Sequence, residues 1–197
     1  MPERPELLVA TGNAGKLGEY RSLLAGAGFE LVPFPTGVEE TGETYEENAR
    51  LKAEAAAAAG GRPALGDDTG IEVEALGGFP GPRAARLAPT QAERTAALLE
   101  RLRDRPRPWP ARFVCAVALA APGEQTLMFR GERAGEVVPE WRGTVGFGYD
   151  PVFYVPEAGR TFGEMGHEEK DRWSHRGEAV RRLLESGALG RLAQARR

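Results

Sequence analysis

The sequence has few of the residues that cross-link secreted proteins or bind zinc. Its 197 residues include one cysteine, Cys115, and two histidines. A single thiol excludes a disulfide framework and favours a reducing compartment such as the cytoplasm. His167 and His175 are close together in the sequence, but neither has a cysteine or a second histidine at the spacing of a zinc site. We therefore do not expect zinc.

Long hydrophobic runs are also missing. No apolar run approaches the ~20 residues that span a bilayer, and the opening MPERPELLVATG does not resemble a signal peptide. We therefore expect no membrane partner. The formal net charge of −3 argues against broad binding to nucleic acid. With 41% hydrophobic residues, the chain can bury a full core as one large domain or two closely packed lobes. A charged ligand must then be bound by a local cluster.

The stretch VATGNAGKLGEY, residues 9–20, lacks two residues of the phosphate-binding loop of ATPases. The pattern G-x-x-x-x-G-K-[ST] requires a glycine and a hydroxyl residue where this chain has Ala10 and Leu17. A strand-to-helix turn with small residues and a lysine near the helix N-terminus still attracts anions. We expect Lys16 to bind phosphate here in another way.

Segments with strand and helix character alternate along the chain, which is typical of an α/β fold. The best-specified helix follows Thr44, which with Glu47 has the pattern of a capping box, and ends at Gly60-Gly61. The proline-rich stretch 103–112 is expected to be a surface connection. We predict strands at 6–10, 29–33, 64–67, 112–120, 125–138 and 152–154, and helices at 15–26, 45–59, 90–103 and 175–187.

Two adjacent aspartates, Asp67 and Asp68, end a short apolar strand and precede Thr69 and Gly70. Neighbouring residues of a strand point to opposite sides, so one carboxylate can face the core and the other a cleft. An Asx-turn that closes the strand is an equally good interpretation. The glycine-rich continuation favours a functional site, because a backbone without side chains lets a ligand approach closely.

The acidic segment 37–52 is a second candidate site, because hard cations such as Mg²⁺ take carboxylate oxygens. Glu39 and Glu40 precede the helix cap. The glutamates of the first helical turn are better explained as complements to the helix dipole. Asn48 and Lys52 are four residues apart, share one helical face and can point into the same cleft.

Two further segments carry aromatic or basic residues beside turns. In GTVGFGYDPVFY, residues 143–154, Phe147 can present its ring to a base, although aromatic residues near turns are more often packing anchors. In EEKDRWSHR, residues 168–176, Lys170, His175 and Arg176 approach or enter the last predicted helix. Ser174-His175 alone would be an ordinary helix start.

The motifs TGNAGK, EETGETYEENA, DDTGIEVEALGGFPG, GFGYDP and EEKDRWSHR stand in this order over roughly residues 7 to 186. In this order they resemble the inosine triphosphate pyrophosphatase family. The resemblance implies a Mg²⁺-dependent hydrolase that converts non-canonical purine nucleoside triphosphates such as ITP, dITP and XTP to the monophosphate and pyrophosphate. It also implies an elongated α/β fold with a long, bent mixed sheet, two lobes that form a single domain over residues 1–197 around a central substrate cleft, and a homodimer.

The resemblance also assigns roles to residues. The phosphates are held by Thr11, Gly12, Asn13, Ala14, Gly15 and Lys16, with Lys52 and Arg86 as looser matches and Thr69 in contact with the substrate. The metal-binding general base is Asp68, and Glu39, or its neighbour Glu40, assists the metal. The base is recognised by Phe147, Gly148, Tyr149, Asp150, Lys170, His175 and Arg176.

Two other functions remain open at the sequence level. The chain can be a pyrophosphatase for pyrimidine or other modified nucleoside triphosphates on a related fold. It can also be a nucleotide sensor without catalysis, although Asp68, Lys16 and the acidic segment argue against this.

The residues that the resemblance assigns to the base also suit its chemistry. Hydrogen-bond donors such as His175 and Arg176 pair with the 6-oxo group of hypoxanthine and xanthine, whereas they leave the 6-amino group of adenine unsatisfied.

Overall fold

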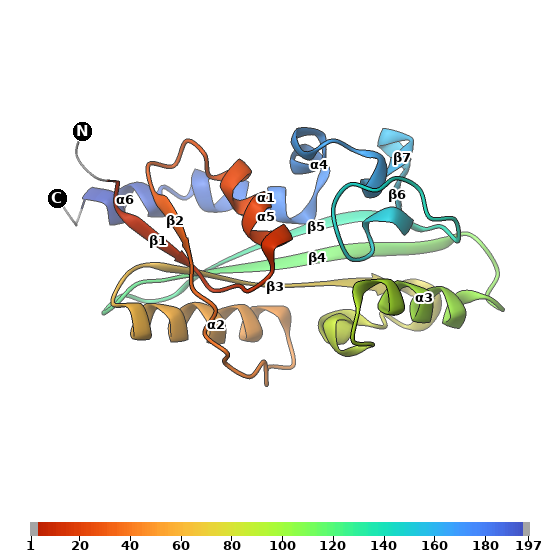
Figure 1. The fold of residues 1–197 in the computed structure, drawn as a ribbon, viewed down its shortest axis with the longest axis horizontal. Coiled ribbons are helices and arrows are strands. Elements are labelled where there is room, and N and C mark those ends of the chain that lie inside the picture. Colours follow the sequence, from red (N-terminus) through yellow and green to blue (C-terminus); the bar gives the residue numbers. More distant parts are fainter. Residues whose placement is uncertain (1–3, 195–197) are drawn as a thin grey trace. The chain divides into compact units, whose positions relative to one another are not determined.

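The structure of the protein, a computed structural model, describes residues 4–194. It is a mixed α/β fold whose seven strands form a sheet in the order β2-β1-β3-β4-β5-β6-β7 (Figure 1). The contacts divide the chain into two compact units. The first contains the residues up to Asp68, Cys115–Gly131 and the residues from Arg176 onward, and the second contains Thr69–Val114 and Glu132–His175. That the chain works as a single domain stays a prediction.

The α/β class and most of the predicted elements are confirmed. The strands are β1 (Glu6–Val9), β2 (Glu30–Pro33), β3 (Ala64–Val73), β4 (Trp109–Ala120), β5 (Leu127–Val137), β6 (Phe153–Val155) and β7 (Arg160–Thr161). The α-helices are α1 (Ala14–Leu23), α2 (Tyr45–Gly60), α3 (Gln91–Leu102), α4 (His167–Trp173), α5 (His175–Glu185) and α6 (Ala188–Gln194). β1 pairs in parallel with β2 and β3, whereas β6 pairs antiparallel with β5 and β7, so the sheet is mixed.

In the first unit, helices cover both faces of the sheet (Figure 1). Successive side chains of a strand point to opposite faces. Leu7 and Val9 of β1 accordingly pack into a core with residues of α1, α5 and α6, whereas Leu8 lies against Gly60 of α2. The same alternation in β3 decides which helix each of the two aspartates meets.

The boundaries of α2 follow the sequence signals. The Thr44 hydroxyl accepts a hydrogen bond from the Glu47 backbone N–H, and the Glu47 carboxylate accepts from the Thr44 N–H, which completes the capping box. Gly61 takes the left-handed conformation that ends the helix. Because its start and end are specified in this way, α2 presents a fixed set of side chains to β3.

The second unit has its own apolar core, built from β3, β4, β5, β6 and the segments around them. The expectation of a surface connection over 103–112 is partly wrong, because β4 begins at Trp109, whose side chain is buried. α4 was not expected, since its sequence HEEKDRW has no apolar periodicity. It carries the buried Lys170 into this unit.

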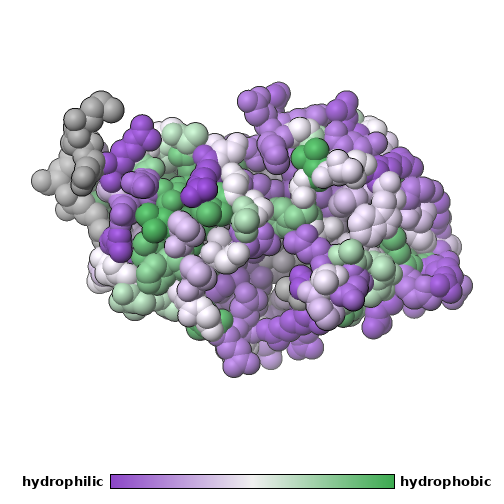
Figure 2. All heavy atoms as spheres, viewed as in Figure 1, coloured by the Kyte–Doolittle hydropathy of each residue, from purple (hydrophilic) through white to green (hydrophobic). Residues whose placement is uncertain are grey.

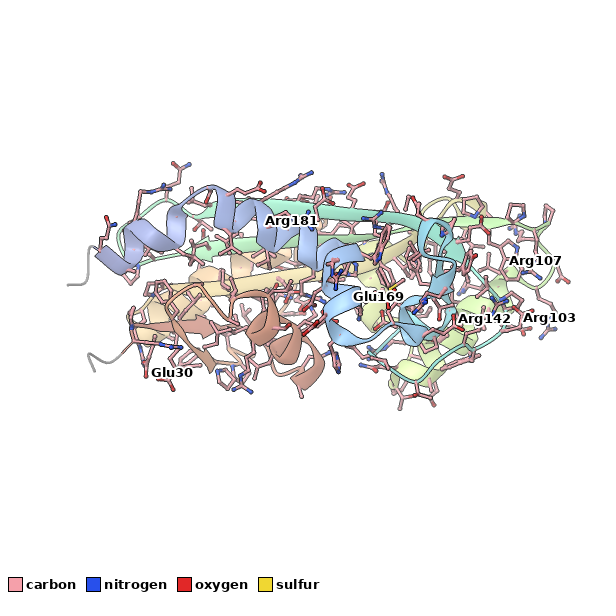
Figure 3. All side chains as sticks on the ribbon, turned by 90° about the horizontal axis from the view of Figure 1, so that it is seen from above. Glu30, Arg103, Arg107, Arg142, Glu169 and Arg181 are labelled. Atoms are coloured by element: carbon pink, nitrogen blue, oxygen red, sulfur yellow. The ribbon has the colours of Figure 1, made fainter. Side chains whose placement is uncertain are left out.

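Most charged side chains lie at the surface, where Figure 2 shows extensive hydrophilic colouring. Glu30, Arg103 and Arg181 are exposed examples, and they point outward in Figure 3. No helix within residues 4–194 is long and apolar enough to cross a membrane. Against this background, the charged side chains that are buried stand out as candidates for function.

Candidate active site

The predicted phosphate loop connects β1 to α1. Asn13 is the N-cap of α1, and its Oδ1 accepts hydrogen bonds from the backbone N–H groups of Gly15, at 2.9 Å, and Lys16, at 3.2 Å. The Thr11 hydroxyl accepts one from the Asn13 N–H at 3.1 Å. The loop is therefore held by its own side chains. Lys16 lies in the first turn of α1, at the end where the helix dipole favours anions.

Asp67 and Asp68 lie inside β3, which continues to Val73, so the Asx-turn interpretation is wrong. The alternation of the strand sends them to opposite faces, as predicted. Leu65 belongs to the core shared with α1 and α5, and Asp67, two residues later, points to the same face of the strand. Gly66 lies against the backbone of α2, and Asp68, two residues later, points to that face.

On the α1 and α5 side, the Asp67 carboxylate binds two cations through one oxygen. Its Oδ2 lies 2.9 Å from the Lys16 Nζ and 3.1 Å from the Arg176 Nη2. The other end of the Arg176 guanidinium pairs with Glu19. Burial opposes ionisation of Asp67, but the charges of Lys16 and Arg176 outweigh it and hold the pKa of the Asp67 carboxyl far below its usual range. Asp67 is therefore a permanent anion.

On the α2 side, Asp68 receives a hydrogen bond from the Asn48 Nδ2 at 3.0 Å. The Lys52 Nζ lies 4.0 Å from the Asp68 Oδ1 and 2.8 Å from the Glu40 Oε1. Asn48 and Lys52 therefore share one face of α2, as expected, and both reach Asp68; that this face borders a cleft stays a prediction. Burial raises the pKa of Asp68, and Glu40 adds to this rise, while Lys52 and Asn48 offset part of it. A buried carboxylate with a raised pKa is suited to accept a proton.

The first unit thus holds a largely buried cluster with four carboxylates and three cations. An anionic ligand such as a triphosphate would be repelled by that excess unless a further cation is bound with it. No group of three or more histidine, cysteine, aspartate and glutamate side chains in residues 4–194 could hold a metal alone. Magnesium commonly uses one or two carboxylates together with substrate phosphates. The cluster consists of Lys16, Lys52, Arg176, Glu19, Glu40, Asp67 and Asp68.

The two glutamates before α2 differ in their surroundings. Glu40 is partly buried and its carboxylate pairs with Lys52, which also lies beside Asp68. Glu39 is exposed. The Asp68 and Glu40 carboxylates therefore lie around one lysine, and this arrangement favours Glu40 over Glu39 for the predicted role beside the metal.

In the second unit, the predicted loop Phe147–Asp150 is tied to α4. The Asp150 Oδ2 accepts a hydrogen bond from the Phe147 N–H at 2.7 Å and lies 2.5 Å from the Lys170 Nζ. The Lys170 Nζ is 4.9 Å from the centre of the Phe147 ring. Asp150 and Lys170 are buried, whereas Phe147 is partly exposed. The buried ion pair fixes the loop so that the aromatic ring has a defined position.

The middle of this loop is anchored by other elements of the second unit. Thr95 of α3 donates a hydrogen bond to the Gly148 carbonyl at 3.3 Å, and Gln91 accepts one from the Gly148 N–H at 3.1 Å. Burial raises the pKa of Tyr149 to about 12, although the charge of Arg94 acts in the other direction. Tyr149 therefore stays neutral in its buried position.

His175 and Arg176 are consecutive but have different environments. The His175 ring is buried and stacks on Phe113, with ring centres 4.5 Å apart and an angle of 9° between planes. Arg176 is 1% exposed and is bound by Asp67 and Glu19. Both side chains are firmly placed by these contacts, and a role in recognising the base stays a prediction for each.

The structure gives positions for the remaining predicted site residues, Thr69 and Arg86. Thr69 follows Asp68 in β3 and is partly exposed, and Arg86 is exposed at the end of a 3-10 turn. Sequence reasoning missed Glu19 as part of the cluster. Its spacing of three residues from Lys16 on one helix places both on the same face, and this was the available signal.

Comparisons with known proteins agree with the family resemblance. The model of the Ham1 family matches residues 7–186. Proteins called dITP/XTP pyrophosphatase are 50% identical over 184 residues in Symbiobacterium thermophilum (91% of this chain and 93% of that protein) and 47% over 188 in Thermus thermophilus (92% and 91%). The solved Ham1 protein of Staphylococcus aureus is 36% identical, has a TM-score of 0.80 and covers 94% of this chain and 99% of its own. The solved HAM1 protein of Coxiella burnetii is 39% identical to this chain and has a TM-score of 0.79. The match covers 91% of this chain and 96% of that protein.

Proposed function

Because the chain belongs to the Ham1 family, we propose that it hydrolyses non-canonical purine nucleoside triphosphates such as ITP, dITP and XTP to the monophosphate and pyrophosphate. The relatives named for dITP and XTP support these substrates. The observation that carries the proposal is Asp68, a buried carboxylate whose pKa is raised and which Asn48 orients beside Lys52.

In this proposal Asp68 is the general base or holds the metal that activates the water. The water oxygen forms a bond to phosphorus, the bond between the α- and β-phosphates breaks, and the proton of the water passes to Asp68. The hydrogen bond from Asn48 leaves the second carboxylate oxygen, Oδ1, on the side of Lys52. This geometry holds the acceptor atom in one place while the reaction proceeds.

Magnesium fits the donors around Lys52, and we propose that Asp68 and Glu40 hold it. A hard cation takes carboxylate oxygens and keeps further positions for phosphates. When bound, it would offset the charge of the triphosphate, which is about four negative charges at neutral pH, and polarise the phosphorus. The carboxylate excess of the cluster gives this chain a reason to need such a cation.

The loop Thr11–Lys16 and Lys52 are proposed to bind the phosphates. Lys16 is 16% exposed in its side chain, so its ammonium can reach a ligand while it stays paired with Asp67. Lys52 is positioned by Glu40 beside the proposed base. Fixed cations at these points stabilise negative charge that develops on the leaving pyrophosphate. Thr69, directly after Asp68, is proposed to contact the substrate.

The base is proposed to be recognised by the Phe147–Asp150 loop, Lys170, His175 and Arg176. The partly exposed Phe147 ring offers a stacking surface, and the Asp150–Lys170 pair holds that ring in place. Hydrogen-bond donors favour a 6-oxo group over a 6-amino group, because a donor opposite a donor leaves both unsatisfied. This chemistry supports hypoxanthine and xanthine over adenine.

A Mg²⁺-dependent assay for pyrophosphate release from XTP, dITP and ITP tests the proposal. Hydrolysis of these substrates supports it, whereas preference for pyrimidine or other modified triphosphates would support the alternative pyrophosphatase. Binding without turnover in the presence of Mg²⁺ would indicate a nucleotide sensor.

We also propose that the protein works as a homodimer in the cytoplasm. The family resemblance supports the dimer, and the single buried thiol Cys115 fits a reducing compartment. Sedimentation of the purified protein at micromolar concentration measures the first point directly. A monomer over the full concentration range of the activity assay would contradict it.

A further inference from the structure

Asp67 lies in the cluster but has no role in the function proposed so far. It is 3% exposed, and its Oδ2 contacts Lys16 at 2.9 Å and Arg176 at 3.1 Å. Its neighbour Asp68 contacts different residues on the other face of β3. Asp67 is therefore close to the phosphate loop through Lys16, and its direct contacts differ from those of the proposed base.

The two cations bound by Asp67 are held to very different degrees. Arg176 is fully buried and has a second carboxylate partner, Glu19, so its position is determined by the core. Lys16 is a flexible side chain that is partly exposed. A free lysine side chain carries about 2 kcal/mol of rotamer entropy. Arg176 thus fixes Asp67, and Asp67 in turn limits where the Lys16 ammonium can lie.

We propose that Asp67 is a positioning residue that holds the Lys16 ammonium ready for the phosphates of the substrate. A cation already in place stabilises the transition state without reorganising during the reaction. This inference rests on the proposed function, in which Lys16 binds phosphate. It gives the two adjacent aspartates separate tasks: Asp68 meets the reacting water, and Asp67 acts on kcat through Lys16.

The charge of Asp67 also predicts how KM and kcat change. The carboxylate opposes binding of an anionic substrate, and its replacement by an amide makes this face of the sheet more positive. Asp67→Asn should therefore not raise KM for XTP. It should lower kcat by about 10-fold or more, because a misplaced cation loses transition-state stabilisation. A structural role alone would reduce the folded fraction and leave this split absent.

A double-mutant cycle tests the proposal on the full-length protein. Asp67→Asn is combined with Lys16→Ala, and kcat for XTP is measured for the four proteins together with their melting temperatures. If Asp67 acts through Lys16, the change at 67 lowers kcat by less than about 2-fold once Lys16 is absent. Lys52→Ala is the matched control, because the Lys52 ammonium forms its ion pairs with Glu40 and Asp68 and affects Asp67 only through its charge, and in this background most of the loss should persist.

Two additional measurements keep the test decisive. Asp67→Glu retains the charge and should keep more of the kcat than Asp67→Asn. If Asp67→Asn does not fold, Asp67→Glu takes its place in the double-mutant cycle. Binding of inorganic pyrophosphate, followed by calorimetry, repeats the cycle without turnover. If positions 16 and 67 are coupled in pyrophosphate binding but the wild-type protein hydrolyses no triphosphate, the proposed function is contradicted and the positioning role of Asp67 is supported. Equal losses with and without Lys16 would overturn the positioning role of Asp67.

Discussion

At the scale of single residues, Asp67 and Asp68 have opposite electrostatic environments although they are neighbours. Asp67 faces Lys16 and Arg176, and its pKa is held far below its usual range despite burial. Asp68 is also buried but has weaker compensation from Lys52, so its pKa is raised. Environments that push two carboxylates apart in pKa commonly separate an ionised group from a group that exchanges protons. This contrast supports the proposal that Asp68, and not Asp67, exchanges the proton.

Asp68→Asn removes the carboxylate that we propose as base and metal ligand, and it keeps the shape of the side chain. We expect kcat for XTP to fall by at least about 10²-fold. Pyrophosphate release by the folded variant is the measurement. Near-normal turnover would move the base to another residue.

The same variant also tests the raised pKa of Asp68 through stability. Since the folded-state pKa lies above the unfolded value, the free energy of unfolding falls as pH rises through this interval. Asparagine does not ionise, so Asp68→Asn should be more stable than wild type at pH 7. The difference should shrink as pH falls toward about 4, near the unfolded pKa of aspartate. Chemical denaturation with a chelator present measures both proteins, and a constant difference would contradict the raised pKa.

Glu39 and Glu40 form a natural matched pair for the proposed metal site. Because the Glu40 carboxylate pairs with Lys52 beside Asp68, whereas Glu39 is exposed, Glu40→Gln should raise the Mg²⁺ concentration needed for half-maximal activity by about 10-fold or more. Glu39→Gln should change it by less than about 2-fold. The reverse result would assign the metal to Glu39.

Arg176 is predicted to serve both stability and base selection. Arg176→Ala removes the buried guanidinium that pairs with both Asp67 and Glu19, and breaking a buried ion pair typically costs about 3–5 kcal/mol of stability. Arg176→Lys keeps the charge and loses the forked hydrogen bonding. If the guanidinium donates to a 6-oxo group, either folded variant should lose about 1.5–3 kcal/mol in kcat/KM for ITP and little for ATP. An unchanged ITP/ATP ratio in a folded variant would remove Arg176 from base recognition.

At the scale of elements, the position of α2 against β3 determines the geometry around Asp68. Asn48 and Lys52 both come from α2, and Asp68 comes from β3. Between them, Gly66 allows the two elements to approach, because a Cβ there would collide with the backbone of Ala49 and Ala53. The glycine directly before the two aspartates therefore has a packing function that also sets the site.

Gly66→Ala should push α2 away from β3, and with it the two side chains that orient Asp68. We expect a lower melting temperature and a lower kcat for XTP, since overpacking of this kind costs about 1–3 kcal/mol. Gly18→Ala is the control, because a Cβ at this exposed position of α1 meets no atom within 4 Å. The control should keep its activity and be up to about 1 kcal/mol more stable. Equal effects of both changes would contradict the close approach.

At the scale of the whole molecule, local sequence signals predicted which helices and strands form better than they predicted where these elements begin and end. The capping box of Thr44 and Glu47 placed α2 correctly. The strand predicted over 64–67 continues to Val73, because pairing within a sheet can hold polar residues such as the two aspartates in extended conformation. α4, with its charged sequence, has no periodic signal, and its place comes from burial of Lys170 against Asp150.

The candidate site was predicted only in part, because local patterns give the local contacts of a site and not its long-range contacts. Alternation along a strand correctly separated Asp67 from Asp68, and helical spacing correctly joined Asn48 to Lys52. The contact of Asp67 with Arg176 joins residues 109 positions apart. No local pattern contains such a contact, because it depends on how α5 packs on the sheet. Long-range pairing is therefore the part of the site that required the structure.

The central claim is that this chain hydrolyses non-canonical purine triphosphates between the α- and β-phosphates. The most direct measurement is Mg²⁺-dependent release of pyrophosphate and monophosphate from XTP, dITP, ITP, GTP and ATP, with Asp68→Asn as the control protein. We predict that kcat/KM for XTP, dITP and ITP exceeds that for ATP by about 10²-fold or more, since donors that meet a 6-oxo group cannot pair with a 6-amino group. Equal rates on ATP and ITP, or release of single phosphate in place of pyrophosphate, would contradict the account.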